Sequence, residues 1–153
     1  MLHPDDALPQ WNTYTCGPAS LRAALLCYGD RVAGPRLAKL AETTWWGTEI
    51  ESIDEAASEY GFRVYRETFR DPANVAKAAL EHLKNRTPLL LATENDDHWI
   101  VAVRGTTRHV WLFDPAFDEG DGLHRVTWRH TLRRIHQGLP DEIRFHLYPL
   151  VPR

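Results

Sequence analysis

Two apolar runs, His98 to Arg104 and His109 to Phe113, lie next to each other in the sequence with only a short turn between them. Each is apolar at successive positions, which is typical of a strand buried on both faces. So short a connection predicts an antiparallel hairpin. Folding the chain about its turn sets His98 opposite Asp114, within one residue of register. Directly paired side chains have Cβ atoms about 5 Å apart, so we expect these two to reach hydrogen-bonding distance.

The remaining periodicity separates the chain into a helical first half and a sheet-forming second half. Pro18 suits the first turn of a helix that Gly29 ends, and Thr48 to Glu51 matches a capping box at the start of another helix. Further helices are expected at 35–41, 50–61 and 72–83, strands at 62–68, 88–93 and 145–151, and a strand end or helix at 126–137. This order predicts an α+β fold, and 153 residues with 43% hydrophobic content predict one domain, 1–153.

Charge and hydropathy exclude several classes of protein. A formal net charge of −3 argues against nucleic acid as a partner. The basic residues between Arg125 and His136 are interpreted as the solvated face of a late helix. No apolar stretch approaches the roughly 20 residues of a membrane span, and the first residues carry no secretory pattern. We therefore expect a cytoplasmic protein.

The chain has two cysteines, Cys16 and Cys27. On one helix they would lie about 16 Å apart along its axis, too far for a disulfide. Both thiols are expected to be free, in agreement with a reducing compartment. Cys27 lies in an apolar stretch and is interpreted as a small buried hydrophobe.

Cys16, by contrast, is placed for nucleophilic chemistry. The reactive form of a thiol is its thiolate, and both a helix N-terminus and a neighbouring imidazolium favour that form. Cys16 opens the first expected helix, and His98 would supply the imidazolium. Asp114 would orient the imidazole, and Pro115 confines Asp114 to extended conformations. Gly17, which has no Cβ, permits a substrate to approach closely.

Gln10 supplies a fourth element, because amide hydrolysis passes through a tetrahedral oxyanion. The Gln10 side-chain amide and the Cys16 backbone N–H are candidate donors to that oxyanion. Losing one such donor typically raises the barrier by about 3–4 kcal/mol. Each feature alone also has a structural explanation: a core cysteine, a core histidine, an ordinary Asp-Pro turn and a surface glutamine. The hypothesis depends on all four occurring together.

Other residues near the candidate site are open to two interpretations. Trp11, Trp46 and Trp99 either line a substrate groove or belong to the core, as large aromatic side chains usually do. The acidic residues Asp118, Glu119 and Asp121 lack the alternation of a calcium loop and are interpreted as a solvated turn. With no Cys/His cluster at ligand spacing, we expect neither a metal nor a cofactor.

The joint pattern resembles the C39 peptidases, which are papain-like cysteine peptidases known as bacteriocin-processing domains. The segment that begins at Gln10 reads Q-x5-C-G-P-A-S-L-x6-Y-G, and H-W-I-V-A-V from His98 and V-W-L-F-D-P-A from Val110 follow in the family's order. The resemblance covers roughly residues 8 to 130. It implies a papain-like fold, a triad of Cys16, His98 and Asp114, and Gln10 in the oxyanion hole.

The function expected from these residues is a stand-alone cysteine peptidase that cleaves a peptide or protein through a thioester, with a partner protein as a possible carrier of the substrate. Two alternatives stay open: an acyl transferase with the same triad, and a peptide-binding domain without catalysis. C39 domains commonly cut leader peptides after a Gly-Gly pair, and the sequence leaves open whether that specificity applies here. It also leaves the oligomeric state open.

Overall fold

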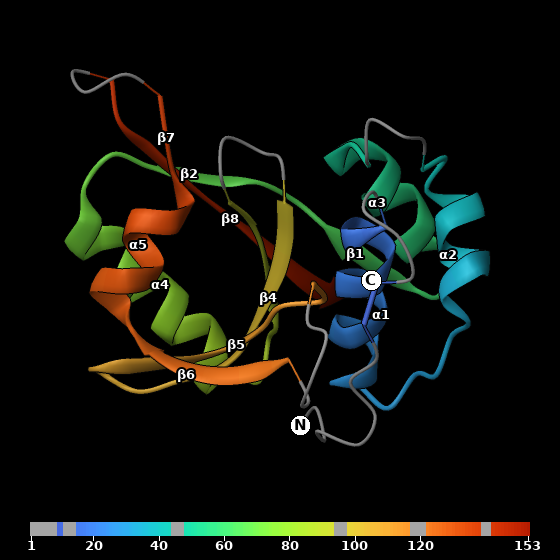
Figure 1. Cartoon of the computed structure of the whole chain (residues 1–153), viewed down its shortest axis with the longest axis horizontal. Coiled ribbons are helices and arrows are strands. Elements are labelled where there is room, and N and C mark those ends of the chain that lie inside the picture. The colour runs from blue at the N-terminus through green and yellow to red at the C-terminus, as the bar shows by residue number, and fades with distance from the viewer. Residues whose placement is uncertain (1–8, 11–14, 44–47, 94–97, 117–121, 139–141) are drawn as a thin grey trace.

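The computed structural model describes residues 9–10, 15–43, 48–93, 98–116, 122–138 and 142–153 (Figure 1). Its helices are α1 (Cys16–Leu26), α2 (Gly34–Leu40), α3 (Ile50–Ser58), α4 (Pro72–Lys84) and α5 (Trp128–Ile135). Its strands are β1 (Phe62–Val64), β2 (Glu67–Phe69), β3 (Leu89–Thr93), β4 (His98–Gly105), β5 (His109–Phe113), β6 (Leu123–Thr127), β7 (His136–Gln137) and β8 (Arg144–Pro152). The predicted α+β class is confirmed, with three helices before the first strand.

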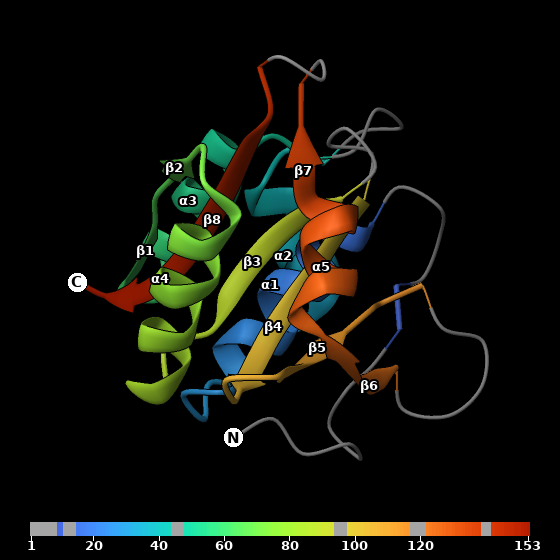
Figure 2. The same ribbon diagram turned by 90° about the vertical axis from the view of Figure 1, so that its left-hand side faces the viewer.

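The strands form one antiparallel sheet in the order β1-β8-β3-β4-β5-β6, and β2 and β7 also pair with β8. The predicted hairpin is the β4–β5 pair near one side of this sheet. Both faces of the sheet are covered by helices, α1 to α3 on one face and α4 with α5 on the other (Figures 1 and 2). This two-sided burial explains why β3 and β4 are apolar at successive positions.

Alternating side chains of β4 divide between the two cores. Trp99 and Val101 join the cluster formed with α1 to α3, whereas Ile100 and Ala102 join the cluster formed with α4 and α5. Helix α1 lies between the sheet and α2 with α3, and residues 16–25 of it are buried. A helix buried all round is a rigid support for a residue at its first turn.

The structure corrects three details of the sequence-based assignment. The strand predicted at 62–68 is two short strands, β1 and β2, that pair separately with β8. The capping box at Thr48 to Glu51 is wrong, because α3 has Glu49 as its N-cap and makes no side-chain capping bond. Strand β6 begins at Leu123, and only its last two residues fall in the segment 126–137 that is predicted to be a strand end or helix. Its first three residues were missed because the side chains of this strand are mostly exposed, which leaves no apolar pattern.

Both cysteines lie within the described part of the chain. Cys16 and Cys27 are both free thiols, as predicted. Within the described ranges, no helix has both the length and the apolar character needed to cross a bilayer.

Candidate active site

The thiol of Cys16 lies where the first turn of α1 meets the start of β4. Cys16 is the first residue of α1, and Pro18 follows in the first turn, where its missing N–H leaves no bond unmade. The Trp99 backbone N–H donates a hydrogen bond to Cys16 Sγ at 3.3 Å. Ser20, one turn along α1, donates to the Trp99 carbonyl oxygen at 3.0 Å. These two bonds fix the sulfur beside the residue that follows His98.

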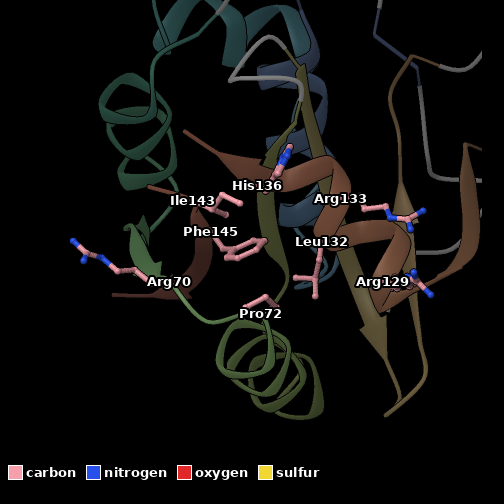
Figure 3. Close-up of a pocket in the computed structure, with 8 residues that line it drawn as sticks. All are labelled: Arg70, Pro72, Arg129, Leu132, Arg133, His136, Ile143 and Phe145. Atoms are coloured by element: carbon pink, nitrogen blue, oxygen red, sulfur yellow. The ribbon is translucent and has the colours of Figure 1, made fainter. Parts of the chain in front are cut away.

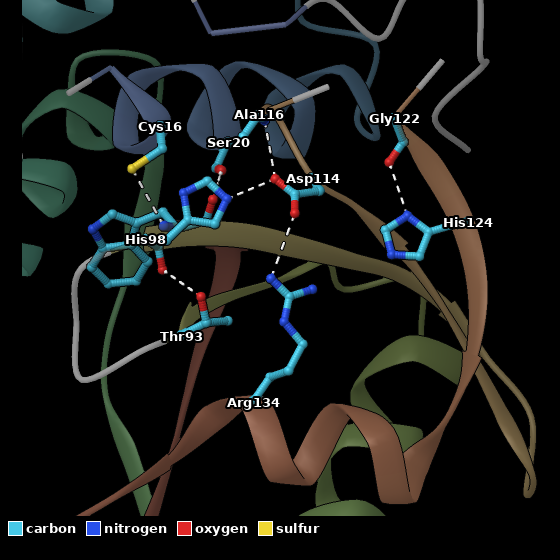
Figure 4. A network of polar contacts seen from close by, with 10 residues as sticks. Cys16, Ser20, Thr93, His98, Asp114, Ala116, Gly122, His124 and Arg134 are labelled. Atoms are coloured by element: carbon cyan, nitrogen blue, oxygen red, sulfur yellow. Dashed lines mark hydrogen bonds and ion pairs between the residues drawn. The ribbon is translucent and has the colours of Figure 1, made fainter. Parts of the chain in front are cut away.

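The imidazole of His98 lies between the thiol and a carboxylate (Figure 4). Its Nε2 atom is 2.6 Å from Asp114 Oδ1, and the Cys16 thiol lies on the other side of the ring. The His98 side chain is 14% exposed and that of Asp114 is 23% exposed, so solvent screens the pair only in part. The three side chains predicted from sequence are therefore brought together, in the order sulfur, imidazole, carboxylate.

The contact between His98 and Asp114 is made in a different register from the one predicted. Thr106 N–H donates to the His109 carbonyl at 2.8 Å, so the turn is centred further along the chain than assumed. Val101 pairs with Phe113, and continuing that register would set Ile100, rather than His98, opposite Asp114. The direct pairing was therefore wrong by two residues. Because side chains alternate with a period of two, the shift keeps both residues on one face as diagonal neighbours.

Asp114 directly follows β5 and is held by both backbone and side-chain contacts. Its N–H donates to the Gly122 carbonyl at 3.0 Å, and its Oδ1 also accepts from the Ala116 N–H at 3.0 Å. Its other oxygen, Oδ2, is 3.5 Å from Arg134 Nη2. The carboxylate is thus oriented by three elements of the fold before any substrate binds.

These contacts shift both partners toward their charged forms. Burial lowers the pKa of His98, but the hydrogen bonds with Asp114 and with Cys16 outweigh it and raise the pKa to about 9. Burial raises the pKa of Asp114, but the hydrogen bonds from His98 and Ala116 and the nearby charges outweigh it and lower the pKa to about 2. Near neutral pH the pair is therefore an imidazolium and a carboxylate.

The shifted pKa values predict how stability depends on pH. The pKa of His98 rises from 6.5 to about 9. The contribution of this group to the free energy of unfolding is therefore complete below pH 6.5 and is lost as the pH rises through about 9. The pKa of Asp114 falls from 3.8 to about 2, so its contribution is complete above 3.8 and is lost as pH falls through about 2. Urea unfolding should show Asp114→Asn less stable than the wild type by about 1–3 kcal/mol near pH 5.5. That difference should shrink by pH 9.5; an equal difference at both pH values would contradict the assignment.

Gln10 is anchored beside the end of the hairpin. Its N–H donates to the Pro115 carbonyl at 2.8 Å, and the preceding Pro9 carbonyl accepts a hydrogen bond from the Arg22 guanidinium at 3.3 Å. These bonds connect residues 9–10 to α1 and to the residue after Asp114. The side-chain oxygen of Gln10 is buried. The oxyanion role of Gln10 stays a prediction.

Gly17 and Trp99 make close contacts within the protein itself. A Cβ at Gly17 would lie 2.8 Å from the Thr48 Cβ, so the missing side chain lets Thr48 pack against α1. Trp99 is 5% exposed, donates from Nε1 to the Thr48 carbonyl at 3.1 Å and packs edge-on against Tyr148. These contacts give both residues a packing role, and contact with substrate stays a prediction for both.

Several predicted features lie outside the described residues. They are Trp11, Trp46 and the acidic residues Asp118, Glu119 and Asp121. Among the residues that the structure does describe, no group of three or more His, Cys, Asp or Glu side chains is arranged to hold a metal ion.

Arg134 is a site residue that sequence analysis missed. It belongs to the basic stretch from Arg125 to His136, whose other arginines and histidines are exposed as predicted. Arg134 is half-buried and turns toward Asp114. The signal available in the sequence is a helical wheel, which places Arg134 on the inner side of α5. The wheel does not identify Asp114 as the residue that Arg134 contacts.

A separate pocket of about 480 Å³ lies on another side of α5, between that helix, the start of α4 and β8 (Figure 3). Its apolar lining residues are Pro72, Leu132, Ile143 and Phe145, and its basic ones are Arg70, Arg129, Arg133 and His136. In Figure 3 the side chains of Arg70, Arg129 and Arg133 extend away from the apolar centre. None of Cys16, His98 and Asp114 lines this pocket, so it is distinct from the candidate site.

Comparisons with solved structures show which fold this is. The peptidase domain of Streptococcus ComA, a bi-functional ABC transporter involved in quorum sensing, matches with a TM-score of 0.69 and 20% identity over 95% of this chain and 97% of that chain. A double glycine motif protease from an AMS/PCAT transporter, in complex with its leader peptide, matches with a TM-score of 0.70 and 19% identity over 95% of this chain and 90% of that chain. The predicted papain-like C39 peptidase fold is confirmed.

Sequence comparisons reach the same family independently. A protein of Methanothermobacter thermautotrophicus, itself uncharacterised, is 30% identical over 130 residues, which cover 84% of this chain and 81% of that protein. The model of the peptidase C39 family matches residues 6–125, and this range includes Gln10, Cys16, His98 and Asp114. The chain therefore belongs to the peptidase C39 family.

Proposed function

We propose that this protein is a cysteine peptidase that hydrolyses a peptide bond through Cys16, His98 and Asp114. The observation that carries the proposal is the position of the His98 imidazole, which lies between the Cys16 thiol and the Asp114 carboxylate and is hydrogen-bonded to the carboxylate. Nε2 of His98 faces Asp114, which leaves Nδ1 for the sulfur. An imidazolium held there favours the thiolate, the form of cysteine that attacks a carbonyl.

In the acylation step, Cys16 Sγ forms a bond to the carbonyl carbon of the substrate. The resulting oxyanion is stabilised by the Cys16 backbone N–H and the Gln10 side-chain amide. The C–N bond then breaks, and the proton on His98 passes to the departing amine. The product of this step is a thioester between Cys16 and the amino-terminal part of the substrate.

Deacylation uses the same imidazole in the opposite direction. His98, now neutral, takes a proton from water while the water oxygen attacks the thioester carbonyl. The C–S bond breaks, the carboxylic acid leaves and the thiolate–imidazolium pair is restored. Asp114 holds the ring orientation in both steps and stabilises its charged form.

A peptide is the substrate class that the relatives support. The AMS/PCAT protease was solved in complex with a leader peptide, and this chain shares its fold. The proposal takes residues 1–153 as one peptidase domain that acts in the cytoplasm.

Product analysis tests hydrolysis against acyl transfer. The protein is incubated with a pool of peptides, with and without hydroxylamine or a primary amine, and the products are identified by mass spectrometry. A peptidase releases a free carboxylic acid, whereas an acyl transferase releases mainly the amide of the added amine. Absence of any product, together with retained peptide binding, would replace the proposal with the non-catalytic peptide-binding alternative.

A further inference from the structure

Arg134 contacts the carboxylate of Asp114 on the side opposite His98. Its Nη2 atom lies 3.5 Å from Asp114 Oδ2, and its side chain is 20% exposed (Figure 4). The other oxygen, Oδ1, accepts from His98 Nε2 at 2.6 Å and from the Ala116 N–H at 3.0 Å. The two carboxylate oxygens therefore have different partners, from different elements of the fold.

Helix α5 holds Arg134 in a fixed position relative to the sheet. The α5 residues Trp128, Thr131 and Ile135 are buried. Trp128 Nε1 donates to the Thr106 carbonyl at 2.7 Å, which ties the start of the helix to the β4–β5 turn. The Thr127 side chain caps the helix by accepting from the His130 N–H at 3.1 Å. An arginine on so anchored a helix can restrain the group that it contacts.

A carboxylate that is held at one oxygen alone can still rotate about its Cβ–Cγ bond. Contact with a cation at the second oxygen removes that freedom, and charge-assisted contacts are the stronger ones in a partly desolvated site. We propose that Arg134 is a positioning residue of the active site, which holds Oδ2 of Asp114 so that Oδ1 remains directed at His98. This inference rests on the proposed function, because it assigns the ion pair a role in orienting the imidazole.

A positioning role and a simple charge effect predict opposite changes at His98. As a cation, Arg134 repels the imidazolium, so removing its charge alone would favour the protonated ring. If Arg134 also positions Asp114, its removal weakens the His98–Asp114 hydrogen bond and the imidazolium becomes less stable. The groups that face this pair among the described residues are Cys16 from α1 and Arg134 from α5, with His124 from β6 bonded to the Gly122 carbonyl nearby.

Steady-state kinetics of Arg134→Gln and Arg133→Gln test the proposal. Arg133 is the adjacent residue on α5, is exposed and lines the separate pocket. Arg133→Gln changes the net charge of the protein by the same amount as Arg134→Gln and therefore serves as the matched control. Arg134→Gln should lower kcat by about 10- to 100-fold, with KM changed less than about twofold. The alkaline limb of the pH profile of kcat should move to lower pH in this variant. Arg133→Gln should keep the wild-type kcat and pH profile. Arg134→Lys, which keeps the charge and loses the planar fork, should recover part of kcat.

An NMR titration of His98 gives a readout that needs no turnover. The pKa of the ring is compared between Cys16→Ala and Cys16→Ala with Arg134→Gln or with Arg134→Lys. Positioning predicts a lower His98 pKa in the Arg134→Gln protein and an intermediate one in the Arg134→Lys protein. An unchanged or raised pKa overturns the inference, whatever the activity. If the pKa falls but Cys16→Ala retains full cleavage, the proposed function fails while the positioning of Asp114 by Arg134 stands.

Discussion

Replacing Cys16 by alanine is expected to abolish peptide cleavage, with a fall in kcat of about ten-thousand-fold or more. The Cys16 sulfur forms the covalent bond to the substrate in the proposed mechanism, and alanine offers no atom that can do so. The fold should persist. The substitution removes one small buried side chain and one hydrogen-bond acceptor for the Trp99 N–H, at a cost of about 1–2 kcal/mol.

Two further variants separate loss of the nucleophile from loss of structure. Cys16→Ser keeps a hydrogen-bond acceptor for Trp99 but replaces a thiol with a much less acidic hydroxyl, so it should fold like the wild type and remain inactive. Cys27→Ala removes the other free thiol of the chain and should retain full activity. Cleavage is measured by mass spectrometry and folding by thermal unfolding. Cleavage at the wild-type rate by Cys16→Ala would show that the sulfur is not the nucleophile.

His98→Gln is expected to have an effect of similar size, with kcat reduced by about a thousand-fold or more. Glutamine can still hydrogen-bond to Asp114, but it can neither hold the proton that stabilises the thiolate nor deliver it to the leaving amine. The variant should bind peptide with nearly unchanged affinity, because glutamine is close to histidine in size and keeps a polar end. The measurement is single-turnover cleavage at saturating enzyme.

A second histidine provides the matched control for His98→Gln. His124 lies on β6, is exposed, and contacts the Gly122 carbonyl at 3.3 Å, without contact to Asp114 or Cys16 in the part of the chain that the structure describes. His124→Gln should leave kcat within about twofold of the wild type. Equal losses in the two variants would indicate a general disturbance of the β5–β6 region rather than a catalytic role of His98.

The sequence was informative about most helices and strands because these elements have local signals. Pro18, Gly29 and the apolar stripe between them define α1, and the apolar runs define β3 to β5. Strand β6 has no such signal, because its side chains are largely exposed and its apolar residues do not alternate regularly. Its pairing with β5 is a tertiary effect that local periodicity does not encode.

The meeting of His98 and Asp114 was predicted for a reason that proved only partly right. The turn is centred further along the chain than assumed, and an irregularity between Ala102 and Arg104 restores one residue of the shift. The net displacement of two residues preserves the face of each side chain, so the contact survives. A displacement of one residue would have put the two side chains on opposite faces of the sheet.

Arg134 could not have been selected from the sequence. Helix α5 carries several basic residues, and which of them turns inward depends on how the helix packs against the sheet. The side chain that it meets comes from the end of β5, a distant element. Contacts of this kind, between two elements whose relative placement is set by the core, are the part of the site that sequence alone does not supply.

In the proposed mechanism the Cys16 thiol and the His98 imidazole form a reactive ion pair, and the alkylation of the two cysteines by iodoacetamide tests this pair most directly. Cys16 is buried whereas Cys27 is half-buried, so access alone would favour Cys27. Peptide mass mapping between pH 5 and 9 should show Cys16 reacting much faster than Cys27 at pH 6, and this advantage should disappear in His98→Gln. If Cys16 reacts at pH 6 no faster than Cys27, and equally in both proteins, the thiol has no activating partner and the account is contradicted.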